Sequence, residues 1–167
     1  MNNTAVVIAR ILLREGVVAD VGDGKGVTSY GQTPGWLADW GFQTPENDVQ
    51  AAVNYRRWMQ LLRLDQVCEL DLELGDGVAD FAVHSGHMES IRALQRAVNV
   101  PADGVIGPAT LAAIQKAPQG TAVRFECQRL RFVGKLLGSK KIDRRKYASG
   151  WCNRLADRIE SAARSRA

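Results

Sequence analysis

Residues 4–16, with the sequence TAVVIARILLREG, decide how the fold begins. Three apolar residues and one acid recur in this stretch at the helical spacings of three, four and seven: Ile8, Ile11, Leu12 and Glu15. Thr4 belongs to the residue types that cap the start of a helix, and Gly16 to those that follow a helix end. The pattern therefore predicts an α-helix over residues 5–15, with Glu15 on its apolar face at the carboxyl-terminal end.

Glu15 is the most informative residue of this helix, because an acid on an apolar face is unusual unless it is partnered or functional. Burial and the negative end of the helix dipole both disfavour its carboxylate form. We expect these effects to raise the pKa of Glu15 and to keep it protonated towards neutral pH, as a general acid requires. The alternative interpretation is an exposed glutamate at a helix end.

A glycine-rich segment follows the first helix. Residues 16–35 hold six glycines with β-branched residues between them, which indicates an irregular loop or a short β-hairpin. Asp20, Asp23 and Thr28 lie on this segment. A loop that folds back over the helix end could bring a carboxylate and a hydroxyl opposite Glu15, as two-carboxylate glycoside hydrolysis requires. Asp-Gly pairs also occur in ordinary turns, and the spacing leaves that alternative open.

The rest of the sequence is typical of an all-α protein. Helical periodicity, proline starts and glycine stops predict further helices over residues 45–63, 76–85, 88–99, 108–114, 121–138 and 147–164. In the first of these the apolar stripe includes Val49, Val53 and Leu61. The predicted fold is all-α with one glycine-rich loop or short β-hairpin.

Composition and charge narrow the function classes. Apolar residues make up 46% and charged residues 24%, as in soluble globular proteins, and no apolar run could span a membrane. The first residues lack the features of a secretory signal, so we expect the chain to start in the cytoplasm. Three cysteines at wide spacings indicate buried thiols. His84 and His87 lack a convincing set of further ligands, so we expect no metal and no cofactor.

The two parts of the chain differ in charge. Residues 1–119 hold 9 Lys/Arg against 14 Asp/Glu, and residues 120–167 hold 13 against 4. Such a basic region favours an anionic partner, which could be a nucleic acid, a membrane surface or a cell-wall polymer. The last predicted helix and the residues just after it carry four arginines, which form either a solvated face or a surface for an anionic membrane: Arg154, Arg158, Arg164 and Arg166. No nucleic-acid-binding fold is recognised, so we do not expect that partner.

Four regions of the sequence resemble one known family. They are LREG (13–16) with Asp23 and GVTSYG (26–31), then DFAVHSG (80–86), then LQRA (94–97) with DGVIGP (103–108), and finally WCNR (151–154). In order and roughly in spacing they resemble the glycoside hydrolase family 108 muramidases, phage-type lysozymes that cut peptidoglycan, together with the peptidoglycan-binding region usually fused to them. The sequence departs from the family pattern at Val17, Val18 and His84.

The resemblance implies a lysozyme-like helical fold and a set of site residues. It makes Glu15 the catalytic acid and Asp23, with Asp20 as the alternative, the carboxylate that activates water or stabilises charge on the sugar. It makes Thr28 a hydroxyl that helps to hold this water. Tyr30 and Gln32 would then line the glycan groove.

The resemblance also implies the activity and the organisation of the chain. Residues 1–90 would form the catalytic region, and residues 91–167 a helical peptidoglycan-binding region packed against it. The protein would be a monomeric endolysin that hydrolyses the β-1,4 bond between N-acetylmuramic acid and N-acetylglucosamine in peptidoglycan, reaching the cell wall from the host cytoplasm through a holin or a similar route. The alternatives are a lytic transglycosylase and a non-catalytic peptidoglycan-binding module.

Overall fold

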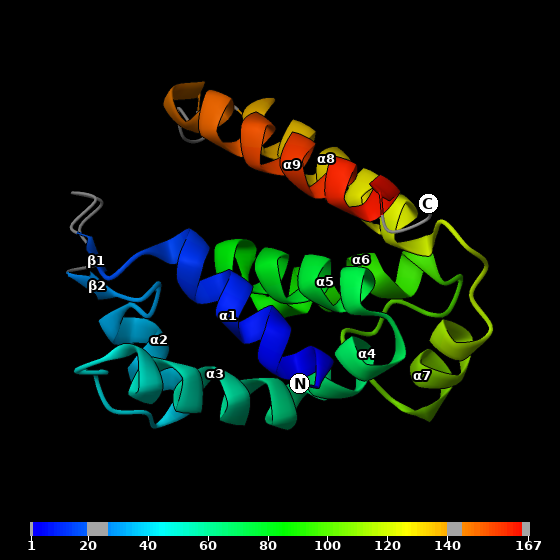
Figure 1. The fold of residues 1–167 in the computed structure, drawn as a ribbon. Coiled ribbons are helices and arrows are strands. Elements are labelled where there is room, and N and C mark those ends of the chain that lie inside the picture. Colours follow the sequence, from blue (N-terminus) through cyan, green and yellow to red (C-terminus); the bar gives the residue numbers. More distant parts are fainter. Residues whose placement is uncertain (1, 20–26, 140–144, 165–167) are drawn as a thin grey trace. The chain divides into compact units, whose positions relative to one another are not determined.

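The computed structural model describes residues 2–19, 27–139 and 145–164. The chain divides into two compact units, Met1–Leu72 and Glu73–Ala167, which are described in turn. The expected all-α fold with a short hairpin is confirmed, since nine α-helices, one short 3₁₀ helix and one two-stranded hairpin make up the regular structure of the described residues (Figure 1). Across these same residues no helix has the length and apolar character needed to cross a membrane.

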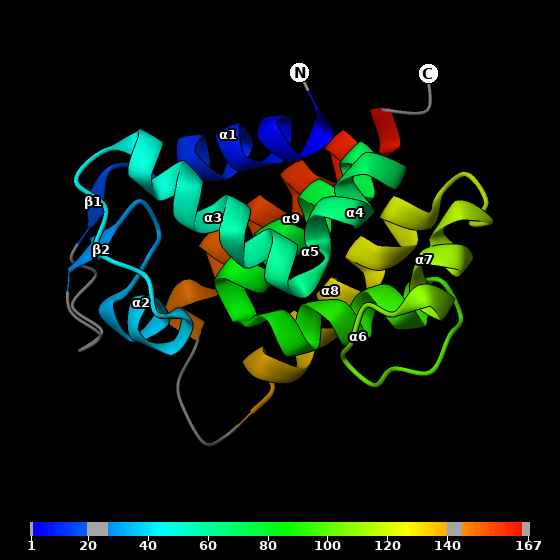
Figure 2. The same ribbon diagram turned by 90° about the horizontal axis from the view of Figure 1, so that it is seen from below.

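The first unit consists of four helices and the hairpin. In chain order they are α1 (Asn3–Glu15), β1 (Val18–Ala19), β2 (Thr28–Ser29), α2 (Pro34–Trp40), α3 (Asp48–Leu62) and α4 (Leu64–Leu70). β1 and β2 pair antiparallel, with Val18 opposite Ser29 and Ala19 opposite Thr28. α1 packs against α3 and α4, and α3 packs against α4 (Figures 1 and 2).

The start of α1 differs from the prediction by two residues. The side chain of Asn2, not Thr4, caps the helix by accepting a hydrogen bond from the Ala5 N–H at 2.9 Å. Thr4 is buried and donates from its hydroxyl (2.8 Å) and its backbone N–H (3.0 Å) to one carboxylate oxygen of Glu69 in α4. The Thr4 hydroxyl, which the sequence predicted to cap the helix, therefore joins α1 to α4.

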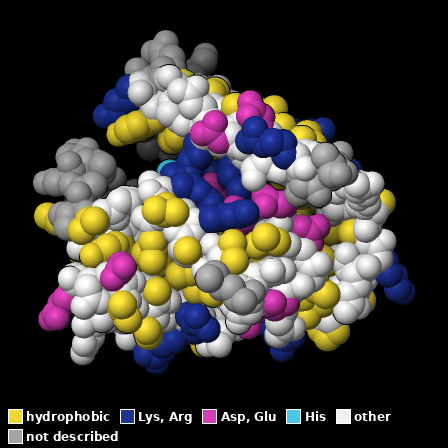
Figure 3. Space-filling model, in the orientation of Figure 1, with side chains coloured by type: hydrophobic (Ala, Val, Ile, Leu, Met, Phe, Trp, Pro, Cys, Tyr) yellow, Lys and Arg dark blue, Asp and Glu magenta, His cyan; other side chains and the backbone are white. Residues whose placement is uncertain are grey.

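The buried face of α3 also differs from the prediction. Val49 and Leu61, expected in the apolar stripe, are 68% and 66% exposed, and Val53 is exposed as well. Figure 3 shows such hydrophobic side chains among polar ones on the surface that α1 and α3 contribute. The buried face carries Tyr55 and Trp58 instead, whose rings each lie within 6 Å of the Trp36 ring in α2. The large aromatic rings cover more apolar area than the valines, and their contacts set the rotation of the helix.

The second unit is a bundle of helices. Its elements are α5 (Leu72–Ser85), α6 (His87–Ala97), α7 (Pro108–Gln115), α8 (Thr121–Leu137), the short 3₁₀ helix η1 (Arg145–Tyr147) and α9 (Ala148–Arg164). α8 packs against both α6 and α9, and α8 and α9 lie side by side in both views (Figures 1 and 2). Phe81 of α5 contacts the rings of Phe125 and Phe132 in α8. These contacts form the apolar core of this unit.

A glycine in α5 lets α8 approach closely. A Cβ atom at Gly77 would lie 2.6 Å from Oε1 of Glu126 and 3.3 Å from the ring of Phe125. Glycine weakens a helix interior, so its presence here is explained by packing and not by helix propensity. Gly77 makes room for a buried carboxylate beside the backbone of α5.

The loop between α6 and α7 is organised by one buried glutamine. Nε2 of Gln95 donates to Oδ1 of Asp103 (2.6 Å) and to the carbonyl of Val105 (3.0 Å), while its Oε1 accepts from the N–H of Gly104 (2.9 Å). The hydrogen bond from Gln95, followed by that from the Val105 N–H, lowers the pKa of Asp103. These hydrogen bonds satisfy the polar groups of Gln95 and of the DGVIGP segment. The segment therefore has a structural role in holding the loop between α6 and α7.

The predicted division into a catalytic region 1–90 and a binding region 91–167 concerns function, and it remains a prediction. The compact units divide at a different place, between Leu72 and Glu73.

Candidate functional site

Glu15 is the last residue of α1, where the hairpin folds back onto the helix end. It is half-buried, and the N–H of the next residue, Gly16, caps the helix by donating to the carbonyl of Leu12 (3.2 Å). The N–H of Tyr30 donates to the carbonyl of Val17 at 2.8 Å. This bond joins the residue that follows β2 to a residue between α1 and β1.

A tight turn over residues 29–32 follows β2. Ser29 and Gln32 exchange two backbone hydrogen bonds of 3.3 and 2.9 Å. The two central residues, Tyr30 and Gly31, both have positive φ angles, 53° and 77°, which is the pattern of a type I′ turn. Such turns match the twist of antiparallel strands, and glycine is favoured at their second central position.

Gly31 lies directly against the side chain of Glu15. A Cβ atom at Gly31 would be 2.6 Å from Cγ of Glu15 and 2.8 Å from the hydroxyl oxygen of Tyr55. This hydroxyl, from α3, donates to the carbonyl of Tyr30 at 2.8 Å. Cβ and Cγ of Glu15 thus pack against the turn at Gly31, which limits the conformations open to this side chain. The hydrogen bond from Tyr55 holds the turn itself to α3.

Gln32 connects the same turn to α3. Its side chain is 1% exposed, its Nε2 donates to the carbonyl of Ala51 (3.0 Å), and its Oε1 accepts from Nδ2 of Asn54 (2.8 Å). These hydrogen bonds therefore anchor the turn after β2 to α3. The expected contact of Gln32 with glycan remains a prediction, and this burial lends it no support.

The structure describes two of the other predicted site residues, Thr28 and Tyr30. Thr28 is half-buried in β2, opposite Ala19, and Tyr30 is half-buried in the turn. Asp23 and the alternative Asp20 fall outside the described residues. The structure thus brings the turn at Tyr30 and Gly31 to Glu15, and the role of a second carboxylate stays a prediction.

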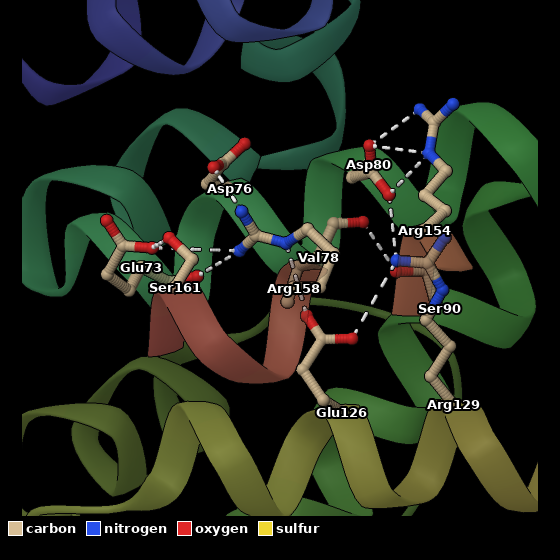
Figure 4. A network of polar contacts seen from close by, with 10 residues as sticks. All are labelled: Glu73, Asp76, Val78, Asp80, Ser90, Glu126, Arg129, Arg154, Arg158 and Ser161. Atoms are coloured by element: carbon tan, nitrogen blue, oxygen red, sulfur yellow. Dashed lines mark hydrogen bonds and ion pairs between the residues drawn. The ribbon is translucent and has the colours of Figure 1, made fainter. Parts of the chain in front are cut away.

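A second feature is a set of buried ion pairs in the Glu73–Ala167 unit (Figure 4). Asp80 of α5 accepts from Nη1 of Arg129 in α8 (2.7 Å) and from Nη2 of Arg154 in α9 (2.7 Å). Asp76, one helical turn earlier, accepts from Nη1 of Arg158 in α9. Both carboxylates are fully buried, so these pairs join three helices in the interior of the unit.

Glu126 lies between the two ends of this set. Its Oε1 lies 3.4 Å from Nε of Arg158, and its Oε2 lies 3.7 Å from Nη1 of Arg129. Burial raises the pKa of Glu126, while the charges of Arg129 and Arg158 act in the opposite direction. The set runs from Glu73 and Ser161 at one end to Arg154 at the other (Figure 4).

These contacts change the interpretation of the basic C-terminal helix. Arg158 is buried and Arg154 pairs with a buried carboxylate, so neither belongs to a solvated basic face. Arg164, further along, is exposed and pairs with Glu160 at 3.4 Å. Acidic side chains lie beside basic ones on the outer face of α9 (Figure 3). Arg166 falls outside the described residues, and binding of this helix to an anionic membrane stays a prediction.

A pocket opens within the same unit at the Arg154 end of the ion pairs. It is formed by the carboxyl-terminal end of α5 and by facing residues of α8 and α9: His84, Arg129, Val133, Leu136, Trp151 and Arg154. Arg154 retains 21% of its side-chain exposure there, against 6% for Arg129. The pocket combines a guanidinium, an imidazole, an indole and an aliphatic wall.

Inspection of the sequence missed several of these residues. Tyr55, Gly31 and the pairs around Glu126 were not recognised. A signal for Glu126 and Arg129 was present, because they share the helical spacing of the buried residues of α8: Ala122, Phe125, Glu126, Arg129 and Val133. Charged residues on that face indicate buried partners, but the sequence does not say where those partners are.

Comparisons with known proteins connect the chain with peptidoglycan. Residues 89–156 match the family model described as "Predicted Peptidoglycan domain". The structure is similar to one described as "Structure of Brucella abortus SagA", with 26% sequence identity, a TM-score of 0.77, and coverage of 96% of this chain and 93% of that one. No curated protein matches the sequence.

These findings support the expected link to peptidoglycan. The C-terminal region is similar to a peptidoglycan domain, and that domain family makes peptidoglycan the supported partner. The match begins at residue 89, whereas Glu15 and the hairpin lie before it. Membership of the narrower glycoside hydrolase family 108 therefore remains a prediction.

Proposed function

We propose that the protein is a muramidase that binds peptidoglycan through its C-terminal region and cuts the glycan with Glu15 as the general acid. The observation that carries this proposal is the setting of Glu15: half-buried at the end of α1, with the turn at Gly31 against its side chain. A positioned acid next to a turn that can contact a substrate suits protonation of a leaving group.

In the proposed reaction, Glu15 gives its proton to the glycosidic oxygen between N-acetylmuramic acid and N-acetylglucosamine as that bond breaks. Asp23, or Asp20, activates the attacking water or stabilises positive charge on the sugar, and Thr28 helps to hold the water. In this proposal Tyr30, half-buried in the turn after β2, lines the glycan groove. The proton lost by Glu15 is restored from the water that completes the hydrolysis.

The C-terminal region would hold the polymer while the acid acts on it. Residues 89–156, which match the peptidoglycan domain, supply this binding in the proposal. A separate binding region keeps an enzyme on an insoluble polymer between cuts, since a second contact raises the effective concentration of the first. A role as a phage endolysin, reaching the wall through a holin, belongs to the same proposal.

The test is digestion of purified peptidoglycan by the full chain and by Glu15→Gln, with the released fragments weighed by mass spectrometry. Glu46→Gln is the matched control, because Glu46 is an exposed glutamate of the same unit, at the start of α3. We expect reducing muropeptides from the wild type and from Glu46→Gln. Loss of a general acid predicts a reduction of about 10²-fold or more for Glu15→Gln.

Two results would contradict this proposal. Anhydro sugars in place of reducing ends would make the protein a lytic transglycosylase, which uses the acid without hydrolysis. Binding to peptidoglycan without any products, from a folded wild type, would leave a binding module and remove the catalytic role of Glu15.

A further inference from the structure

The pocket beside Arg154 has no part in the chemistry proposed for Glu15, and its lining is distinctive. Arg154 and Arg129 share the single carboxylate of Asp80, with oxygen–nitrogen distances of 2.7 Å in both cases. Arg154 lies at the end of the set of ion pairs. Of the two arginines that line the pocket, Arg154 is more exposed than Arg129. The pocket therefore presents a fixed guanidinium, held in place by a buried acid.

A guanidinium held in this way suits a carboxylate ligand. Its side-chain rotamer is already fixed by Asp80, so little conformational freedom is lost when a further anion binds. His84, which also lines the pocket, adds an imidazole donor. The unit as a whole is basic, with 16 Lys/Arg against 9 Asp/Glu in residues 73–167, which favours approach of an anion.

The pocket also has an apolar lining. Val133 and Leu136 of α8 form an aliphatic wall, and Trp151 of α9 contributes an indole ring. Tyr147 stacks on Trp151 with ring centroids 5.7 Å apart and an interplanar angle of 21°, and Lys146 lies over Tyr147 at 4.8 Å. The stack fixes the position of the indole, and the pocket gains a rigid apolar surface next to its charged end.

We propose that this pocket binds the stem peptide of peptidoglycan, with a free carboxylate at Arg154 and His84 and the aliphatic part of the peptide against Trp151 and Leu136. The inference rests on the proposed function, since it names the part of peptidoglycan that the C-terminal region holds. A short peptide with free carboxylates and small alkyl side chains matches the pairing of cation and apolar wall. A neutral sugar ring would leave the charge of the pocket unused.

The test measures binding of L-alanyl-γ-D-glutamyl-meso-diaminopimelate to the full chain by calorimetry, with chitotetraose as a glycan that lacks the peptide. His84→Glu places a carboxylate at the pocket beside Arg154 and is expected to weaken binding of the tripeptide tenfold or more. Trp151→Leu is expected to weaken it severalfold. His87→Glu makes the same charge change three residues away, outside the pocket lining, and should leave the affinity unchanged.

Sedimentation of each variant with whole peptidoglycan separates the two proposals. If the wild type sediments with the polymer but does not bind the tripeptide, the stem-peptide inference is wrong and the proposed function stands. Unchanged tripeptide binding by a folded His84→Glu variant, or chitotetraose binding that this variant loses, would also overturn the inference. Failure of the wild type to sediment would reject peptidoglycan binding itself, and the inference with it. Circular dichroism spectra show whether each variant is folded.

Discussion

The guanidinium of Arg154 lies 2.7 Å from the carboxylate of Asp80, a residue 74 positions earlier in the chain. This pair joins the acidic and the basic parts of the sequence within one compact unit. Part of the basic charge of residues 120–167 is therefore neutralised inside the protein by acids from earlier in the chain. Only the remaining basic charge is available to a partner.

Asp80→Asn should destabilise the protein strongly. The change removes the negative charge shared by Arg129 and Arg154, and breaking a buried ion pair costs about 3–5 kcal/mol of unfolding free energy. Urea denaturation followed by circular dichroism measures this loss. Asp157→Asn, at an exposed position of α9, is the control and should change the free energy by less than about 0.5 kcal/mol. Equal stability of the two variants would show that the pairs around Asp80 contribute little.

Glu126→Gln should alter the pH dependence of stability. Burial raises the pKa of Glu126 above its ordinary value of 4.5, so the fold favours the protonated acid. The stabilising contribution of this preference is full below pH 4.5 and is lost as the pH rises through the folded pKa. The melting temperature of the variant should therefore improve, relative to wild type, between pH 4 and pH 7.

The control for Glu126 is Glu160→Gln, at an exposed position of α9. Its melting temperature should follow the wild type across this pH range. A Glu126→Gln variant whose difference from wild type is independent of pH would contradict the raised pKa.

Asp103→Asn should change the pH dependence of stability in the opposite sense to Glu126→Gln. The hydrogen bonds from Gln95 and from the Val105 N–H lower the pKa of Asp103 below its ordinary value of 3.8. Its contribution to stability is thus present above pH 3.8 and is lost as the pH falls through the folded pKa. The difference in melting temperature between wild type and variant should shrink from pH 6 towards pH 3. A difference that grows on acidification would refute the assignment.

Gly31→Ala should reduce both stability and activity. The new Cβ would lie 2.6 Å from Cγ of Glu15, and a φ of 77° costs a non-glycine residue about 1–2 kcal/mol. We expect a lower melting temperature and, if Glu15 is the acid, a loss of peptidoglycan hydrolysis in the fraction that remains folded. Gly35→Ala is the matched control: it lies in α2 with open space around it and should fold and act as wild type does.

Much of the fold could be predicted because its signals are local. The helix that ends at Glu15, the hairpin after it and the helices 121–137 and 148–164 follow from spacing, caps and glycine stops. The predicted cap at Thr4 and the stripe of Val49, Val53 and Leu61 were wrong. In each case a tertiary contact, Thr4 with Glu69 or Trp58 with Trp36, outweighed the local preference.

The candidate site was predictable only in part. Glu15 stands out because its own helix places it at the helix end, but the contact of its side chain with Gly31 and the hydrogen bond from Tyr55 to the Tyr30 carbonyl depend on a turn and a distant helix. Gln32 was expected beside the glycan, and the structure shows it bonded to Ala51 and Asn54 in the interior. A polar side chain next to a loop looks the same in sequence whether it faces a ligand or another helix.

The sequence by itself determined that the chain is mostly helical and that an acid closes the first helix, because these properties depend on neighbours within one or two turns. Only the tertiary structure decided that Arg129 and Arg158 lie inside, paired with acids 49 and 82 residues away. The physical reason is that burial of a charge depends on an opposite charge brought close in space, and a local pattern of charges is the same whether its partner is water or a buried carboxylate.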